Sequence, residues 1–196
     1  MICAIVLAAG RSRRMGTQKL LLPIAGKPII ARVVDELRQS SVTATLVVTG
    51  ADGKEIQQAL SGRDVSFINN PAADGDMLSS IRCGLRALPS GYKAALIALG
   101  DQPNLTSELV AKLIAGFIES GRGIILPTHQ DHRGHPVLMT RKLCEKLTSH
   151  HYDAGLREFL DTHPGEVFRV EISDNAALQD MDTPEDYQRH LSYSRP

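Results

Sequence analysis

Short apolar runs alternate with segments of helical periodicity over the first 126 residues of the chain. The first run, 2–8, contains only apolar residues and precedes Ala9 and Gly10, which is typical of a strand buried on both faces. Alternation of this kind favours a mostly parallel sheet whose strands are joined by helices through right-handed crossovers. We therefore predict an α/β fold: a single-domain, doubly wound and mostly parallel sheet over the 196 residues.

Hydrophobic periodicity and turn residues give approximate bounds for these elements. We expect strands at 2–8, 45–49, 65–68, 93–99, 123–126, 137–140 and 166–172, and helices at 28–37, 54–60, 77–88, 106–119, 141–148, 155–160 and from 184 onward. Pro28 is expected at the first helical position, and Pro127 is expected to end the fifth strand. Thr183 and Asp186 have the spacing of a helix-capping pair. Ligands of parallel sheets bind beyond the carboxyl ends of strands, so the residues after the strands should be the informative ones.

The composition excludes several other classes of protein. Apolar residues make up 42% of the chain and charged residues 22%, so disorder is excluded as the main state. No apolar stretch approaches the roughly 18 residues of a membrane span, and no basic region precedes the apolar start, as it would in a signal peptide. Zero net charge and a small set of aromatic residues (four Tyr, four Phe and no Trp) argue against nucleic acid as a partner. Cys3, Cys83 and Cys144 lack a CxxC spacing and are expected to be reduced thiols, which indicates a cytoplasmic protein.

The zero net charge conceals two oppositely charged ends. Before the first acidic residue, Asp35, the chain carries only basic charges: Arg11, Arg13, Arg14, Lys19, Lys27 and Arg32. Between Arg169 and Arg189 it carries only acidic ones: Glu171, Asp174, Asp180, Asp182, Glu185 and Asp186. Charge runs usually form solvated faces, but this polarity also suits an anion site near one end and a cation site near the other.

The loop after the first strand combines glycines with basic residues, in the order LAAGRSRRMGTQK from Leu7 to Lys19. Glycine lets backbone N–H groups approach phosphate closely, and the basic side chains supply positive charge. The spacing of Gly10 and Gly16, with Thr17 after them, fits neither a Walker A loop nor a GxGxxG fingerprint. The position at the carboxyl end of a strand favours phosphate binding over an ordinary basic surface loop.

Acidic residues occur at two later positions that suit a metal ion. Asp101 follows the apolar run 94–99 and Gly100, where its carboxylate can reach Mg²⁺, a cation that prefers oxygen ligands. Asp180 and Asp182 are separated by one residue before the last helix, so both can project to the same side. Either could instead cap that helix, and spacing alone does not choose between them.

Taken together, these motifs and several others resemble one known family. The loop fits the pattern L-x-x-G-x-x-x-R-M-G-x-x-K of nucleotidyltransferases that transfer a nucleotide from a nucleoside triphosphate to a phosphorylated acceptor. The later motifs are Asn70 with GDMLSS (75–80), GDQP (100–103), RGHPVL (133–138), DxGxR (153–157) and DMDTPED (180–186). In this order, over nearly the whole chain, the sequence resembles the molybdenum cofactor cytidylyltransferases, within the molybdenum cofactor guanylyltransferase-like group.

The resemblance implies a Rossmann-like nucleotidyltransferase fold, with nucleotide bound by the N-terminal part and the pterin acceptor bound from about residue 128 onward. It implies catalytic roles for Arg14 toward the β- and γ-phosphates, Lys19 toward the α-phosphate, and Asp101. It assigns Mg²⁺ to Asp101 and Asp182, with Asp180 in reserve. The expected nucleotide-binding residues are Leu7, Ala8, Ala9, Gly10, Arg11, Ser12, Arg14, Met15, Gly16, Lys19, Asn70, Ser79 and Ser80.

The nucleotide and the acceptor follow from the same resemblance. Ala9 before Gly10, rather than two glycines, resembles the cytidine-using branch, so CTP is expected and GTP is the alternative. Ser79 and Ser80 could equally belong to a capped helix N-terminus. The expected acceptor-binding residues are Arg133, Gly134, His135, Asp153 and Arg157, with Arg133 paired to the acceptor phosphate.

We therefore expect a Mg²⁺-dependent cytidylyltransferase that joins CMP from CTP to the phosphate of molybdopterin or its molybdenum-loaded form. The acceptor phosphate is already anionic, so the reaction needs positioning and charge stabilisation rather than a strong base. One alternative is a nucleotidyltransferase for a sugar phosphate or another phosphate acceptor. The other is a non-catalytic protein that binds the finished cofactor and delivers it. Transient contact with an apo-molybdoenzyme is expected, and no nucleic acid or membrane.

Overall fold

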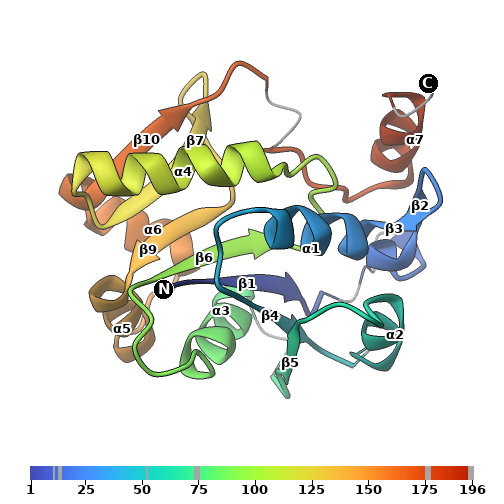
Figure 1. The fold of residues 1–196 in the computed structure, drawn as a ribbon, viewed down its shortest axis with the longest axis horizontal. Helices are drawn as coiled ribbons and strands as arrows, with labels where there is room; N and C mark the ends of the chain where they lie inside the picture. Colours follow the sequence, from blue (N-terminus) through green and yellow to red (C-terminus); the bar gives the residue numbers. More distant parts are fainter. Residues whose placement is uncertain (11, 13–14, 52, 73–75, 175–177, 194–196) are drawn as a thin grey trace.

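The computed structural model describes the chain apart from residues 11, 13–14, 52, 73–75, 175–177 and 194–196. In the described part, an eight-stranded sheet runs through the centre of the molecule and carries helices on both faces (Figure 1). Its strands are β1 (Ile2–Ala8), β4 (Ala44–Thr49), β5 (Ser66–Asn69), β6 (Ala94–Leu99), β7 (Ile124–His129), β8 (His132–Arg133), β9 (Val137–Thr140) and β10 (Val167–Glu171). A separate hairpin pairs β2 (Pro23–Ile24) with β3 (Lys27–Pro28).

The sheet is mixed but mostly parallel. Its strand order is β10-β7-β9-β6-β1-β4-β5, with β8 paired to β7. The strands β6, β1, β4 and β5 pair in parallel, and so do β7 and β10. Only β8 and β9 among the described strands of this sheet run against their neighbours. The predicted α/β class and mostly parallel sheet are confirmed.

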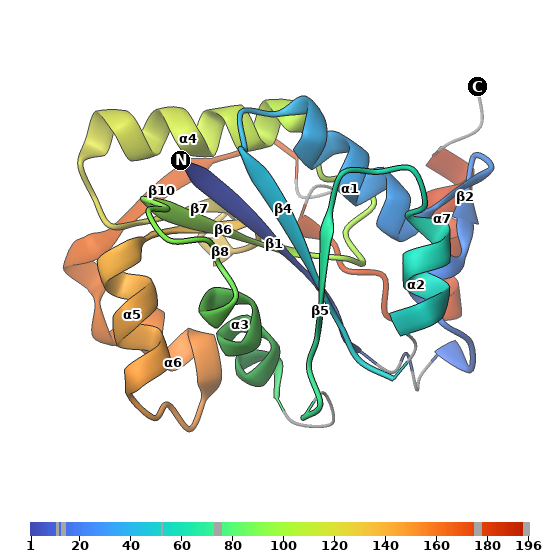
Figure 2. The same ribbon diagram turned by 60° about the horizontal axis from the view of Figure 1, so that its bottom comes forward.

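The helices form a layer on each face of the sheet. The layer on one face contains α1 (Ile29–Gln39) and α4 (Ser107–Ser120), and the layer on the other contains α3 (Met77–Arg86), α5 (Arg141–Ser149) and α6 (Gly155–Thr162) (Figures 1 and 2). At one end of the molecule lie α2 (Gly53–Ala59), α7 (Pro184–Tyr193) and the β2–β3 hairpin. Two short 3₁₀ turns are η2 (Lys19–Leu21) and η3 (Pro164–Glu166). No helix in the described ranges is long and apolar enough to cross a membrane.

Two buried clusters follow from the alternation of side chains along the strands. Val6 of β1 packs in the cluster that contains Leu113 of α4, whereas Ile5, its neighbour, packs with Ile81 of α3 and Phe159 of α6. Successive side chains of a strand point to opposite faces, so an all-apolar strand is stable only when both faces are covered. The continuous apolar runs in the sequence therefore correspond to strands in the middle of the sheet.

Two proline positions differ from the expectations. Pro28 lies before α1, at its N-cap, and pairs with Pro23 in the hairpin. Pro127 lies inside β7, which continues to His129. The carbonyl of Pro127 accepts from the N–H of Gly134, so the strand keeps a hydrogen bond there although proline has no donor. Pairing on both sides of β7 thus overrides the local tendency of proline to end a strand.

A small third cluster attaches the C-terminal segment to the rest of the fold. Met181 is fully buried against Ile24 and Ile29, and the Tyr187 hydroxyl donates to the carbonyl of Pro23 at 2.7 Å. These contacts bring the acidic segment to the end of the sheet where β1 and β6 finish.

We expect Gly84→Ala to lower the free energy of unfolding by about 1–2 kcal/mol. A Cβ at this position of α3 would lie 2.6 Å from Cγ2 of Ile5 and 3.0 Å from Cγ2 of Val48, both in the sheet. Overpacking costs about 1–3 kcal/mol, and with these two close contacts we take about 2–3 kcal/mol at this site. The roughly 1 kcal/mol that alanine gains over glycine in a helix offsets part of that cost. Urea denaturation measures the difference. The control is Gly165→Ala, where a Cβ meets nothing within 4 Å, and equal midpoints for the two variants would contradict the expectation.

Candidate active site

A cavity of about 320 Å³ lies at the carboxyl ends of β1 and β6. These strands are parallel and Leu7 pairs with Leu99, so the loops after both strands begin on the same side of the sheet. The cavity is lined by Leu7, Ala9, Gly10, Lys19, Leu20, Asp76, Met77, Ser80, Leu99, Asp101, Asp180 and Asp182. It brings together the glycine-rich loop, the first turn of α3 and both acidic segments.

Lys19 lies between two carboxylates in this cavity. Its ammonium donates to the carboxylate of Asp101 and, at 2.8 Å, to Oδ1 of Asp182. The side chains of Lys19 and Asp101 are 13% and 16% exposed, so their contact is partly shielded from water. The two acidic residues expected to bind a metal therefore converge on one cationic group of the protein.

The backbone before η2 determines where Lys19 points. Ser12 Oγ accepts from the backbone N–H of Lys19 at 3.1 Å and donates to Oε1 of Gln18 at 3.0 Å. The side-chain oxygen of Gln18 in turn accepts from the N–H of Leu20, which caps the short helix. Gly16, in the turn just before, has a φ of 66°, a conformation that favours glycine. The loop thus positions the lysine through contacts within the loop.

The charges around Lys19 keep it protonated. Burial lowers the pKa of Lys19, but the attraction of Asp101 and Asp182 outweighs burial, so the pKa lies above its ordinary value. The pKa of Asp180 is also raised, first by loss of solvent around its carboxyl and then by repulsion from Asp101. Two carboxylates against one ammonium leave local negative charge that favours a further cation.

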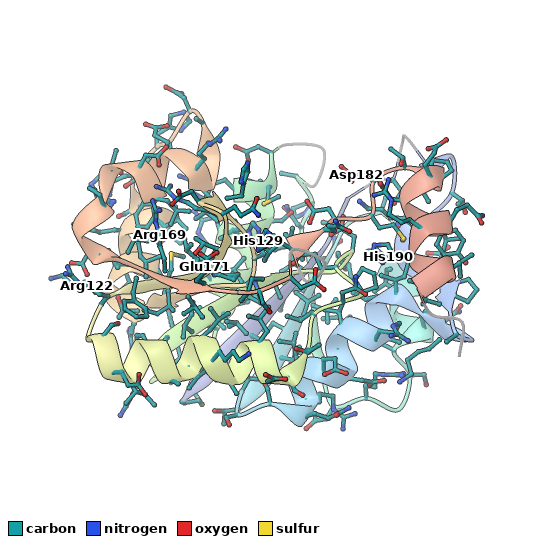
Figure 3. All side chains as sticks on the ribbon, turned by 90° about the horizontal axis from the view of Figure 1, so that it is seen from above. Arg122, His129, Arg169, Glu171, Asp182 and His190 are labelled. Carbon is teal, nitrogen blue, oxygen red and sulfur yellow. The ribbon has the colours of Figure 1, made fainter. Side chains whose placement is uncertain are left out.

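The structure distinguishes Asp180 from Asp182. Asp182 contacts Lys19, whereas Oδ1 of Asp180 accepts from Nε2 of Gln102 at 2.8 Å. The cap of α7 is made by Thr183 and Asp186, as predicted, through reciprocal backbone contacts of 2.9 and 3.2 Å. Figure 3 shows Asp182 just ahead of α7 and His190 further along that helix.

The first turn of α3 forms part of the cavity wall. Asn70, directly after β5, is 4% exposed and donates to the hydroxyls of Ser79 and Ser80 at 3.1 and 3.0 Å. Asp76 accepts from the N–H of Ser79 at 2.9 Å, so this carboxylate caps α3. Ser80 lines the cavity, and Ser79 Oγ donates to the carbonyl of Ala72 at 3.3 Å. Of the two expected serines, Ser80 is therefore the one that faces the site.

The other expected loop residues differ in their exposure to the cavity. Leu7, Ala9 and Gly10 line it. Ala8 is 3% exposed within β1, and the N–H of Met15 donates to the carbonyl of Ser12 in a turn. Arg11 and Arg14 lie outside the described residues, so their expected contacts with phosphate stay predictions.

None of the five expected acceptor residues is among the described residues that line the cavity. Arg133 donates to Oδ1 of Asp161 on α6 at 2.6 Å, and Arg157 is exposed on the same helix. Asp153, 93% exposed, accepts from His151 at 3.0 Å. These contacts bring β8 next to α6 but do not connect either element to the cavity.

Gly134 and His135 are more enclosed than the other acceptor candidates. A Cβ on Gly134 would lie 2.4 Å from Cδ2 of Leu178, so glycine allows the C-terminal segment to approach. Burial lowers the pKa of His135 to about 4, so the ring is neutral at neutral pH. Its Nε2 is buried and has no hydrogen-bond partner among the described residues.

Two residues of the site have no counterpart in the sequence analysis. Asp76 and Gln102 lie inside the motifs GDMLSS and GDQP, but the resemblance implies no role for either. Asp76 has the local spacing of a helix N-cap, three residues before Ser79, and that spacing could have identified it. The partners of Gln102, Leu178 and Asp180, lie far away in the chain, so no local pattern indicates them. No group of three or more His, Cys, Asp or Glu that could hold a metal ion occurs in the described ranges.

We expect Lys19→Met to destabilise the fold by about 2 kcal/mol at pH 7, less than the roughly 3–5 kcal/mol for breaking fully buried pairs. Without the ammonium, Asp101 and Asp182 face each other and repel. Millimolar Mg²⁺ should restore much of the melting temperature by occupying the same position. The control is Lys27→Met, which removes an exposed contact with Asp35 and should show no Mg²⁺ effect. Lack of a Mg²⁺ effect on Lys19→Met would contradict the convergence of the two carboxylates.

Comparison with known proteins identifies relatives of this chain. Residues 4–167 match the family model described as the MobA-like NTP transferase domain. The molybdenum cofactor cytidylyltransferase of Escherichia coli (strain K12) is 27% identical over 187 residues, which cover 95% of this chain and 93% of that protein.

Solved structures with the same fold cover almost the entire chain. The Mycobacterium sp. strain JC1 homologue of Mycobacterium tuberculosis Rv0371c superposes with a TM-score of 0.85 at 27% identity, over 98% of this chain and 96% of the other. A nucleotidyl transferase from Methanothermobacter thermautotrophicus superposes with a TM-score of 0.84 at 26% identity, over 99% and 97%. With the family match over most of its length, the chain belongs to the MobA-like NTP transferases, a family of nucleotidyltransferases.

Proposed function

We propose that this protein transfers CMP from CTP to the terminal phosphate of molybdopterin, or of its molybdenum-loaded form, with release of pyrophosphate. The observation that supports the proposal is the cavity, which Gly10 and Lys19 of the glycine-rich loop line together with Asp101 and Asp182. Such a cavity offers backbone N–H groups and a cation to phosphates, and carboxylates to the metal that accompanies them.

The proposed reaction is an in-line substitution at the α-phosphorus. An oxygen of the acceptor phosphate forms a bond to that phosphorus while the bond to the bridging oxygen of the β-phosphate breaks, and the electron pair leaves with pyrophosphate. The attacking group is already anionic, so no side chain has to remove a proton. What the protein contributes is positioning and charge stabilisation.

The residues of the loop have separate tasks in this proposal. Lys19 lines the same cavity as Gly10, so its ammonium can donate to oxygens of the α-phosphate as charge develops there. Arg14 and the backbone N–H groups of residues 10–16 would hold the β- and γ-phosphates. Ser80, with Asn70 behind it, would contact the base or the ribose.

The donor set fits Mg²⁺. Asp101 and Asp182 present carboxylate oxygens that already converge on one cationic group, and Mg²⁺ prefers oxygen ligands with phosphate oxygens and water in its shell. These two residues would hold the ion. When bound, it would neutralise charge on the phosphates and on the leaving pyrophosphate.

The choice of acceptor and of nucleotide base is supported by similarity to a relative and by one sequence position. The relative in Escherichia coli is named for the cytidylyl transfer and for the molybdenum cofactor, and it aligns with almost the whole chain. Ala9 before Gly10 supports CTP over GTP. Arg133 would pair with the acceptor phosphate, and Gly134, His135, Asp153 and Arg157 would form the pterin side, in the part of the chain from about residue 128. A cytoplasmic enzyme that passes its product to an apo-molybdoenzyme would fit these assignments.

Pyrophosphate release, measured with Mg²⁺, molybdopterin and each of the four nucleoside triphosphates, tests the proposal. We expect CTP to give the highest kcat/KM. Turnover with GTP but with none of the other three nucleoside triphosphates would overturn the choice of base. Turnover with a sugar phosphate in place of molybdopterin would overturn the acceptor. Tight binding of the finished dinucleotide cofactor without any turnover would indicate a delivery protein instead.

Asp101→Asn and Asp182→Asn should each lower kcat/KM by about 10²–10³, as expected when charge stabilisation of the transition state is lost. The matched control is Asp131→Asn, a 93% exposed carboxylate that pairs only with Arg169 among the described residues; its kcat/KM should equal that of the wild type. Circular dichroism confirms that each variant is folded. Full activity of Asp101→Asn would contradict the metal assignment.

A further inference from the structure

We propose that Gln102 is a positioning residue for this site: its side-chain amide holds the segment 178–182 and, through it, the carboxylate of Asp182 opposite Asp101. The inference rests on the function proposed above and deepens it. Gln102 follows Asp101 in the chain but is not one of the described residues that line the cavity. It would therefore act through its neighbours rather than through contact with the nucleotide.

The Gln102 amide connects the end of β6 to the C-terminal segment. The side chain is 2% exposed, and its Nε2 donates to the carbonyl of Leu178 at 3.3 Å and to Oδ1 of Asp180 at 2.8 Å. Both partners are acceptors, so turning the amide over would place its oxygen against two other oxygens. The donor orientation is therefore determined by the surroundings.

A backbone contact supports the same connection. The N–H of Met181 donates to the carbonyl of Asp101 at 3.1 Å, and the Met181 side chain is fully buried between Ile24 and Ile29. Residues 179–182 belong to no helix or strand. Their position therefore depends on side-chain and backbone contacts of this kind. Met181 makes the last of these contacts, and Asp182 directly follows Met181 in the chain.

The amide does more than fill space. Its Oε1 is buried and has no hydrogen-bond partner among the described residues. A buried acceptor without a partner destabilises a fold, and an apolar side chain of the same length would avoid that cost. What the glutamine supplies in return is the pair of donated hydrogen bonds to residues 178 and 180.

The first test is the binding of Mn²⁺, used as a spectroscopic substitute for Mg²⁺, in the presence of saturating CTP and measured by electron paramagnetic resonance. Gln102→Met keeps the length of the side chain and removes both donors. We expect the Kd for Mn²⁺ to rise about tenfold, at the lower end of the range for groups that orient metal ligands. The affinity for CTP without metal should not change. The control Arg63→Met, which breaks a pair with Asp35 in another part of the fold, should leave the Kd for Mn²⁺ as in the wild type.

The second test exchanges donor and acceptor. Gln102→Glu alone puts a carboxylate next to Asp180 and should weaken Mn²⁺ binding at least as much as Gln102→Met. The double variant Gln102→Glu/Asp180→Asn has the net charge of the wild type and reverses the direction of the hydrogen bond. We expect it to bind Mn²⁺ more tightly than Gln102→Glu, because the introduced amide donates to the introduced carboxylate.

Either of two results would overturn the inference: an unchanged Kd for Mn²⁺ in Gln102→Met, or a double variant no better than Gln102→Glu. The choice of nucleotide separates this outcome from failure of the proposed function. If the wild type binds Mn²⁺ with GTP and not with CTP, the cytidine assignment is wrong. The comparison of Gln102→Met with the wild type, made with GTP, then still decides the role of Gln102.

Discussion

The contact of Lys19 with Asp101 and Asp182 is the interaction on which the site depends. Its partners are 82 and 163 positions away from Lys19 in the chain. Two carboxylates so close together would repel without a cation between them. The lysine therefore holds together two carboxylates that come from distant parts of the chain, and the fold brings these three side chains to one place.

The parallel register of β1 and β6 brings two of these three side chains together, those of Lys19 and Asp101. Leu7 pairs with Leu99, so the glycine-rich loop and Asp101 leave the sheet at the same level. The third side chain, Asp182, lies outside the sheet. The small apolar cluster around Met181 and the capping pair Thr183–Asp186 at the start of α7 hold it in place. Hydrophobic burial thus sets the approximate place of the acidic segment, and polar contacts set its direction.

The parts of this structure that could be predicted are those determined locally. Apolar runs and helical spacing identified the strands and helices. The glycine-rich loop and Asp101 could be recognised because glycine and charged residues directly follow predicted strands. The antiparallel β9 between β6 and β7 could not be predicted, because strand order depends on pairing between distant segments. The place of Pro127 inside β7 could not be predicted either, since Val170 of β10, with which it pairs, comes from a distant part of the chain.

Within the site, sequence reasoning identified types of residue better than their partners. Asp180 and Asp182 are equivalent by spacing, and only the contacts with Gln102 and Lys19 distinguish them. Gln102 carried no signal of its own, because its main-chain acceptor lies 76 positions away. The residues expected to bind the acceptor are predicted from family resemblance. The same is true of the roles of Arg11 and Arg14.

The origin of Asp182 in a segment beyond β10 has a consequence for how the protein acquires activity during synthesis. Chains emerge from the ribosome N-terminal end first, and the early parts can fold before the later parts exist. The glycine-rich loop and Asp101 therefore come within reach of each other well before the second carboxylate is made. A nascent chain with a complete central sheet would hold only one of the two carboxylates that contact Lys19, and the proposed metal site would form only when the final acidic segment docks.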